Sequence, residues 1–265
     1  MSDDRLETVL DAAVTVVKVA YEKDVRYPAA AMAYYAFVSF VPVLLLVFAV
    51  VGEQVLAELG TALPQFLTFE ARRLVYEATT TASGQAGGSV LAAAVIAWSG
   101  ANVATDFQTV VERVEEAGER SLREQLFDAV VVLGSLALAM FAILFTSLLF
   151  TLPPEGSFAG LVILFITLTV AFVPLYYVPS TVLPSPEAAL PGAMTTAFGW
   201  TIIHAGILFY AENAAQYAIY GVLSGIIIIL TSLYIASSVL VIGVIVNATM
   251  ADGADTREVS DIRKM

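Results

Sequence analysis

The sequence predicts an all-α membrane protein with six transmembrane helices. Apolar residues make up 59% of its 265 residues, and the mean hydropathy is +0.84. Soluble domains usually contain about 45–50% apolar residues. The charged residues lie almost entirely between or beyond long apolar runs. This segregation predicts one polytopic membrane domain covering residues 1–265.

The charge balance is strongly acidic, with a formal net charge of −12. Such an excess does not suit nucleic acid as a partner or attraction to an acidic lipid surface. We interpret it as a composition typical of proteins in a high-salt, halophilic cytoplasm. The chain contains no cysteine, which excludes disulfides, zinc–thiolate sites and thiol chemistry. We expect no cofactor and no metal.

The N-terminal segment, residues 5–23, places apolar residues at helical spacing and leaves one charged face. This pattern is typical of an amphipathic helix. The segment is too polar to cross a bilayer. We therefore expect an interfacial helix that leads into the first transmembrane helix.

The first predicted transmembrane helix, residues 28–51, carries no charged residue. At about 1.5 Å per residue it is about 36 Å long, enough to cross a hydrocarbon core of about 30 Å. Pro28 occupies the first position, where a helix tolerates proline best. Pro42 lies inside the helix and predicts a kink, because it frees the carbonyl of Val38. Ser39 or a neighbouring helix would have to satisfy that carbonyl.

The remaining chain alternates between apolar runs and polar connections. Residues 52–87 are mixed in character and predict two short amphipathic helices that end in the loop signal TTTASGQAGG. Residues 112–125 are charged and predict a solvated connection, and residues 179–191 are proline-rich. The further transmembrane helices are expected at about 89–111, 129–152, 158–179, 192–210 and 220–247, followed by a cytoplasmic tail at 252–265.

Lysine and arginine predict the orientation, because they favour cytoplasmic loops. With six transmembrane helices, all basic residues except Arg72 and Arg73 fall on one side of the membrane. Both termini are therefore expected in the cytoplasm, and the protein in the cell membrane. A count of five or seven helices would separate the two basic tails.

Several ordered motifs resemble the YihY/BrkB family of integral membrane proteins. They are AAAMAYYAFVSFVPVLLL at the first apolar run, then IAWSGANV at 96–103, PLYYVP at 174–179, LPGA at 190–193, YAIYGVLSG at 217–225 and LYIASSVLVIGVIVNA at 233–248. The resemblance covers nearly the whole chain. It implies a multi-pass membrane architecture, whereas the biochemical function of the family is uncertain.

The chain departs from the family pattern at two positions. Ile245 stands where the family usually has an acidic residue, two positions before the asparagine of Gly-x-x-x-Asn-Ala. Ser232 stands where the family often has a tryptophan. Any transport mechanism that needs that acid would not carry over to this chain.

Polar residues at membrane depth are the candidate functional residues, because they usually face a cavity or a partner. Asn102 and Asp106 lie four residues apart on one helix face. They could line a polar groove, or Asp106 could simply reach the cytoplasmic interface. His204 and Glu212 lie eight residues apart and could form a proton-sensitive pair. The alternative is a neutral, hydrogen-bonded histidine with Glu212 in water.

Two further polar strips lie at the first and last predicted transmembrane helices. One contains Tyr34, Tyr35 and Ser39, facing the Pro42 kink, and the other contains Tyr217, Tyr220 and Ser224. Each could line a path or could hold helices together. Small residues that would allow close helix contacts accompany them, at Gly192, Gly199, Gly206, Gly221, Gly225 and Gly243.

Two classes of function remain open from the sequence. One is a transport protein or lipid-handling permease, and the other is a structural or interaction protein of the envelope without a substrate. An enzyme is not expected, because clustered metal ligands, a phosphate-binding loop and a nucleophile elbow are not found. The expected partners are membrane lipids, with a homo-oligomer left open and nucleic acid excluded.

Overall fold

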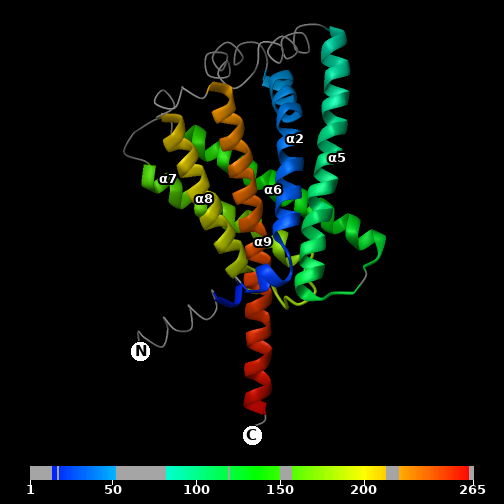
Figure 1. The fold of residues 1–265 in the computed structure, drawn as a ribbon, viewed down its shortest axis with the longest axis vertical. Helices are drawn as coiled ribbons and strands as arrows, with labels where there is room; N and C mark the ends of the chain where they lie inside the picture. Colours follow the sequence, from blue (N-terminus) through cyan, green and yellow to red (C-terminus); the bar gives the residue numbers. More distant parts are fainter. Residues whose placement is uncertain are drawn as a thin grey trace. The chain divides into compact units, whose positions relative to one another are not determined.

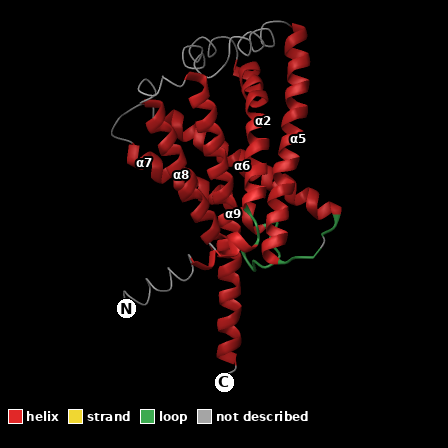
Figure 2. Cartoon of the chain, in the orientation of Figure 1, coloured by secondary structure: helices red, strands yellow, loops and turns green. Residues whose placement is uncertain are grey.

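The computed structural model describes residues 14–16, 18–51, 82–118, 120–149, 157–212 and 221–262. In these residues the chain is helical, without a strand, as Figure 2 shows. The α-helices, labelled in Figure 1, are α2 (Arg26–Val51), α5 (Ala82–Glu115), α6 (Leu122–Leu149), α7 (Ser157–Tyr177), α8 (Leu190–Glu212) and α9 (Gly221–Ile262). A short 3₁₀ helix, η3 (Pro186–Ala189), precedes α8. The all-α prediction is confirmed.

Five helical segments of the described chain are long and apolar enough to cross a membrane. They are Val90–Glu115, Leu122–Ser147, Phe158–Tyr177, Pro186–Tyr210 and Gly225–Asp252. Helix α2 occupies the position of the first predicted transmembrane helix, and its sequence is uncharged from Pro28 to its end at Val51. The helices therefore agree with a six-helix membrane protein.

The helix ends differ from the predicted boundaries. Helix α5 already begins at Ala82, so residues 82–88 of the predicted loop signal are helical. The connection predicted at 112–125 is limited to residues 116–121, because α5 ends at Glu115 and α6 begins at Leu122. Helix α9 continues to Ile262, through most of the predicted tail. Hydropathy locates the apolar part of a helix, whereas the backbone hydrogen bonds continue into the polar flanks.

Two other predictions fall largely outside the described residues. Of the predicted amphipathic helix at 5–23, residues 14–16 and 18–22 are helical. The two short helices predicted within 52–87 lie outside the described residues as far as residue 81.

The proline-rich segment contains η3, and α8 follows it directly with Pro191 in its first turn, where proline fits a helix well.

The chain divides into two compact units, each described here by itself. Unit 1 contains residues 1–30, 104–206 and 235–265, and unit 2 contains residues 31–103 and 207–234. In unit 1, α6 packs against α7. Val132 and Ala139 of α6 are buried, as are Leu164, Leu168 and Leu175 of α7. These residues recur at helical spacing, so each helix buries one apolar stripe.

A buried cluster of hydroxyl groups joins α7, α8 and α9 within unit 1. The hydroxyl of Tyr176 on α7 lies 2.5 Å from the hydroxyl of Thr196 on α8. Tyr176 also donates to the carbonyl of Leu240 on α9 at 2.9 Å, and Thr196 donates to the carbonyl of Val239 at 3.2 Å. We call Tyr176, Thr196 and Gly243 the tyrosine cluster. The two hydroxyl protons make two of these three hydrogen bonds at any one time, and each hydroxyl has a partner within the protein, as an apolar surrounding requires.

Glycines allow α8 and α9 to approach closely. A Cβ atom at Gly243 would lie 2.6 Å from the hydroxyl oxygen of Thr196, and one at Gly199 would lie 2.6 Å from a methyl group of Val239. A Cβ atom at Gly192 would lie 2.5 Å from the side-chain nitrogen of Asn247. The predicted role of these three glycines in helix packing is confirmed. At Gly206 it is wrong, because a Cβ atom there would meet nothing within 4 Å.

Candidate functional site

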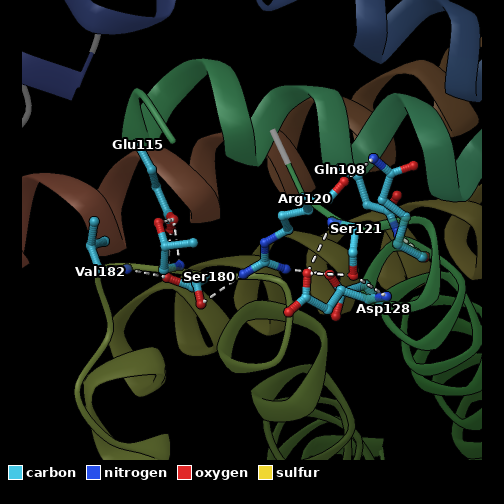
Figure 3. Close-up of polar contacts among 10 residues, drawn as sticks. Gln108, Glu115, Arg120, Ser121, Asp128, Ser180 and Val182 are labelled. Carbon is cyan, nitrogen blue, oxygen red and sulfur yellow. Dashed lines mark hydrogen bonds and ion pairs between the residues drawn. The ribbon is translucent and has the colours of Figure 1, made fainter. Parts of the chain in front are cut away.

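A polar site forms in unit 1 where the end of α5, the start of α6 and the α7–α8 connection meet (Figure 3). The backbone reverses after α5 because Glu116 adopts a left-handed conformation, with φ of 53°. Helix α6 then begins with a capping box. The backbone N–H of Ser121 donates to Glu124 at 3.0 Å, and the backbone N–H of Glu124 lies 3.4 Å from the hydroxyl of Ser121. This reciprocal cap fixes the position at which α6 begins.

Glu115, the last residue of α5, holds the α7–α8 connection. Its carboxylate accepts hydrogen bonds from the Ser180 hydroxyl at 2.5 Å and from the Thr181 backbone N–H at 2.7 Å. The Ser180 oxygen in turn accepts from the backbone N–H of Val182 at 3.3 Å, which closes a tight serine turn. Figure 3 shows these groups pointing toward one another. A charged acceptor strengthens such bonds relative to neutral ones.

Arg120 and Asp128 form an ion pair on the other side of the site. The side chains are 18% and 5% exposed, respectively, so the pair is largely shielded from water. The guanidinium also donates to the carbonyl of Ser180 at 3.4 Å. Gln125 supports the same turn, because its side-chain amide donates to the carbonyl of Arg120 at 3.2 Å. The connection before α6 is therefore held to both α6 and the segment after α7.

A cavity of about 890 Å³ opens at this point. It is lined by Gly118, Arg120, Ser121, Arg123, Glu124, Phe127, Asp128, Val178 and Thr181. Four lining residues are charged, and three of them have partners: Arg120 pairs with Asp128, and Glu124 accepts from Ser121. Arg123 is exposed and makes no hydrogen bond or ion pair within the described chain. The lining therefore carries two positive and two negative charges, and the guanidinium of Arg123 is the one charged group of the lining for which the described residues supply no partner. In the described residues, no three His, Asp or Glu side chains are placed to hold a metal ion.

The N-terminal segment contacts the same region. The ammonium group of Lys23 lies 2.7 Å from the carboxylate of Glu116, and Arg113 donates to the carbonyl of Lys23 at 3.3 Å. The hydrogen bond from Lys23, together with its charge, lowers the pKa of Glu116. The segment before α2, the α5–α6 connection and the α7–α8 connection therefore lie together.

The predicted strip in α2 makes local contacts in unit 2. Tyr34 is 56% exposed, whereas the ring of Tyr35 packs edge-on against Trp98 with 5.4 Å between centroids. The hydroxyl of Ser39 donates to the carbonyl of Ala36 at 2.9 Å. Of the two partners expected for the carbonyl of Val38, Ser39 is therefore wrong, and a neighbouring helix stays a prediction. The helix continues through Pro42 to Val51, and the bend at Pro42 stays a prediction.

The side chains of Asn102 and Asp106 have different surroundings. The side-chain amide of Asn102 donates to the carbonyl of Trp98, one turn earlier in the same helix, at 2.7 Å. Asp106 belongs to unit 1, where it is half-buried and one of its carboxylate oxygens is buried without a hydrogen bond. His204 is half-buried in α8.

The other predicted residues cannot be placed in the same detail. Glu212 is the last residue of α8 and Ser224 lies in the first turn of α9, but the side chains of both lie outside the described set. Tyr220 lies outside the described residues. The cavity next to Arg120 is lined by none of the residues selected from the sequence as a polar path. A role for those residues stays a prediction.

Sequence reasoning missed the site around Arg120 because it treated residues 112–125 as solvated. Two signals could have revealed it. The pattern Ser-Leu-Arg-Glu at 121–124 is a capping box that marks a helix start. Asp128 directly precedes the apolar run that begins at Ala129, and a carboxylate there predicts a cationic partner.

Comparison with known families gives one match over most of the chain. A family model described as "Virulence factor BrkB" matches residues 16–264. No curated protein and no solved structure matches the chain. The matched region includes the tyrosine cluster, the Arg120–Asp128 ion pair and the cavity.

Proposed function

The chain belongs to the BrkB family of membrane proteins, and we propose that it is a lipid-handling permease of the cell membrane with both termini in the cytoplasm. One observation carries the proposal: the polar cavity beside α6 opens next to a long exposed apolar surface of the same helix. A polar cavity that adjoins lipid suits a molecule with a polar head and an apolar tail.

The apolar surface begins within the cavity itself. Phe127 lines the cavity and is 62% exposed. Val130, Leu138, Phe141 and Phe145 continue the same helix face and are 68%, 50%, 63% and 52% exposed. Positions three, four, seven or eight residues apart share one face of a helix, so these side chains form one stripe, which Gly134 interrupts between Val130 and Leu138. In a bilayer such a stripe faces acyl chains.

Translocation in proteoliposomes tests the proposal. The full chain is reconstituted with a fluorescent phospholipid in both leaflets, and a membrane-impermeant quencher is added outside. A lipid-handling permease lets more than half of the fluorescence be quenched, because the inner-leaflet lipid exchanges outward. Quenching that stops at the outer-leaflet fraction, as in protein-free liposomes, for phospholipids of several head groups would contradict the proposal.

Two glycines offer a matched pair of variants. Gly118 lines the cavity, and a Cβ atom there would meet no atom within 4 Å. Gly118→Leu should therefore narrow the cavity without a clash and slow translocation. Gly206 on α8 is equally open, does not line the cavity and does not belong to the stripe on α6, so Gly206→Leu should leave the rate unchanged. Equal translocation rates for the two variants would show that the cavity is not part of the translocation pathway.

A structural role without a substrate is the second candidate, favoured by the tyrosine cluster. Tyr176 and Thr196 join three helices through hydrogen bonds to one another and to the carbonyls of α9, and Gly243 leaves room for their hydroxyl groups. Residues whose polar groups are all used in this way hold helices together. In this case proteoliposomes would show no translocation, while loss of the protein would alter the envelope.

A further inference from the structure

We propose that Arg123 binds the phosphate group of a membrane phospholipid, whose acyl chain lies along the exposed stripe of α6 that begins at Phe127. This inference rests on the proposed lipid-handling function and names the chemical group that the cavity recognises. Three observations on unit 1 carry it: the uncommitted charge of Arg123, the cavity beside it and the apolar stripe that continues its helix face.

The other cations in the region are already paired. Lys18 lies 3.8 Å from Glu22, Lys23 lies 2.7 Å from Glu116, and Arg120 is paired with Asp128. Arg113 donates to a backbone carbonyl. Among the cations of unit 1 whose side chains are described, Arg123 is the exception. A guanidinium offers a planar set of N–H donors that fits phosphate oxygens, so an uncommitted arginine favours that ligand.

The position of Arg123 on α6 selects a lipid. Arg123, Phe127 and Val130 follow one another at spacings of four and three residues and therefore share a face. The face is charged at its start and apolar beyond it. A phospholipid has the same order of groups, with a phosphate at the membrane surface and acyl chains below. Arginines at a helix end reach toward the head-group layer in this way.

The neighbouring carboxylates keep their charge, but other groups of the protein hold their oxygens. Glu124 accepts hydrogen bonds from both the hydroxyl and the backbone N–H of Ser121, at 2.8 Å and 3.0 Å. Asp128 is only 5% exposed and faces Arg120. Both acids are therefore engaged within the protein, and the cavity of about 890 Å³ leaves room for a head group beside Arg123.

Equilibrium binding to the detergent-solubilised full chain tests the proposal. The probes are a fluorescent phosphatidylglycerol, a diacylglycerol with the same chains but no phosphate, and glycerol 3-phosphate as the free phosphate ester. We expect phosphatidylglycerol to bind, with neither of the other two competing effectively. Equal binding of the diacylglycerol would overturn phosphate recognition, and equal binding of glycerol 3-phosphate would overturn the assignment to a lipid.

Variants of Arg123 locate the site. Arg123→Gln should weaken phosphatidylglycerol binding by about tenfold or more, as expected for loss of a charged hydrogen bond. Arg123→Lys should retain part of the affinity. Lys18→Gln removes a cation from the same unit and should leave binding unchanged. Unchanged binding in Arg123→Gln would refute the inference, as would an equal loss in Lys18→Gln, which would indicate general charge attraction.

The result separates this inference from the proposed function. Phospholipid binding that requires Arg123, without translocation in proteoliposomes, would support the site and contradict the permease. Translocation that is unaffected by Arg123→Gln would support the permease and contradict the site.

Discussion

Asn247 on α9 caps the first turn of α8, because its side-chain oxygen accepts a hydrogen bond from the backbone N–H of Gly192 at 2.7 Å. Its side-chain nitrogen donates to the carbonyl of Ala189 at 3.3 Å. Asn247 is 3% exposed. One buried side chain thus satisfies backbone groups on both sides of the η3–α8 boundary, where a helix start leaves N–H groups without partners.

Substitution of Gly192 should separate α8 from α9. In Gly192→Ala the new methyl group would lie 2.5 Å from the side-chain nitrogen of Asn247, so the helices must shift and the cap must break. We expect a loss of about 1–3 kcal/mol, the usual cost of overpacking a close contact. Thermal unfolding in detergent measures it. Gly206→Ala on the same helix, which meets no atom within 4 Å, is the control.

Removal of the Tyr176 hydroxyl should destabilise the tyrosine cluster without changing the helix content. Tyr176→Phe leaves the carbonyl of Leu240 without its donor and deprives Thr196 of its partner at 2.5 Å. The expected cost is about 1–3 kcal/mol, because the groups left behind are buried. Tyr177→Phe on the next position, whose side chain is half-buried, should cost less. Equal unfolding temperatures for the two variants would contradict a structural role for Tyr176.

The Arg120–Asp128 ion pair should be strongly coupled. Arg120→Gln leaves the carboxylate of Asp128 buried without its cation, and loss of one partner of a buried pair costs about 3–5 kcal/mol. The double variant Arg120→Gln with Asp128→Asn should recover much of this loss, because neither charge remains. A double-mutant cycle on unfolding free energies measures the coupling. Additive effects of the two single variants would show that the pair contributes nothing specific.

The contact between Lys23 and Glu116 should stabilise the protein in a pH-dependent way. The pKa of Glu116 is lowered in the folded chain by the hydrogen bond and charge of Lys23. Its contribution is therefore fully present above the pKa of the unfolded chain and is lost as the pH falls through the folded value. Unfolding temperatures of the wild type and of Glu116→Gln are measured across the acidic range. The part of the pH dependence that comes from Glu116 should be missing in the variant. Identical pH profiles for the variant and the wild type would exclude a pH-dependent contribution of this contact to stability.

Labelling of single cysteines tests the topology, since the natural chain contains none. Gly118→Cys lies in the α5–α6 connection, and Val182→Cys lies in the exposed part of the α7–α8 connection. An impermeant thiol reagent should label both from the cytoplasmic side only. Arg72→Cys should react only from the opposite side. Labelling of position 72 from the cytoplasm would contradict six transmembrane helices.

The sequence predicted the helices better than the site, for a physical reason. An uncharged run such as residues 28–51 can only be stable in a bilayer as a helix, because its backbone groups must be satisfied internally. Helix ends such as Glu115 depend on local caps and on the left-handed conformation of Glu116. Hydropathy does not detect either feature.

The candidate site depends on contacts between residues far apart in the chain. Glu115 meets Ser180, and Arg120 reaches both Asp128 and the carbonyl of Ser180. A run of charged residues in the sequence does not show which of their side chains face the interior of the protein. The close packing of Gly192, Gly199 and Gly243 was predictable because small residues in membrane helices are enriched where two helices approach closely.

The cap on α8 also constrains the order in which the protein can be completed during synthesis. Helix α8 leaves the ribosome before α9, and until α9 is made the backbone N–H of Gly192 lacks its Asn247 partner. The same delay applies to Trp200, whose indole N–H donates to the carbonyl of Ala236 on α9 at 3.1 Å. A nascent chain halted between the two helices would therefore carry an α8 with unmatched donors, exposed to lipid or to quality-control proteases. Helices α8 and α9 are best delivered to the bilayer as a pair.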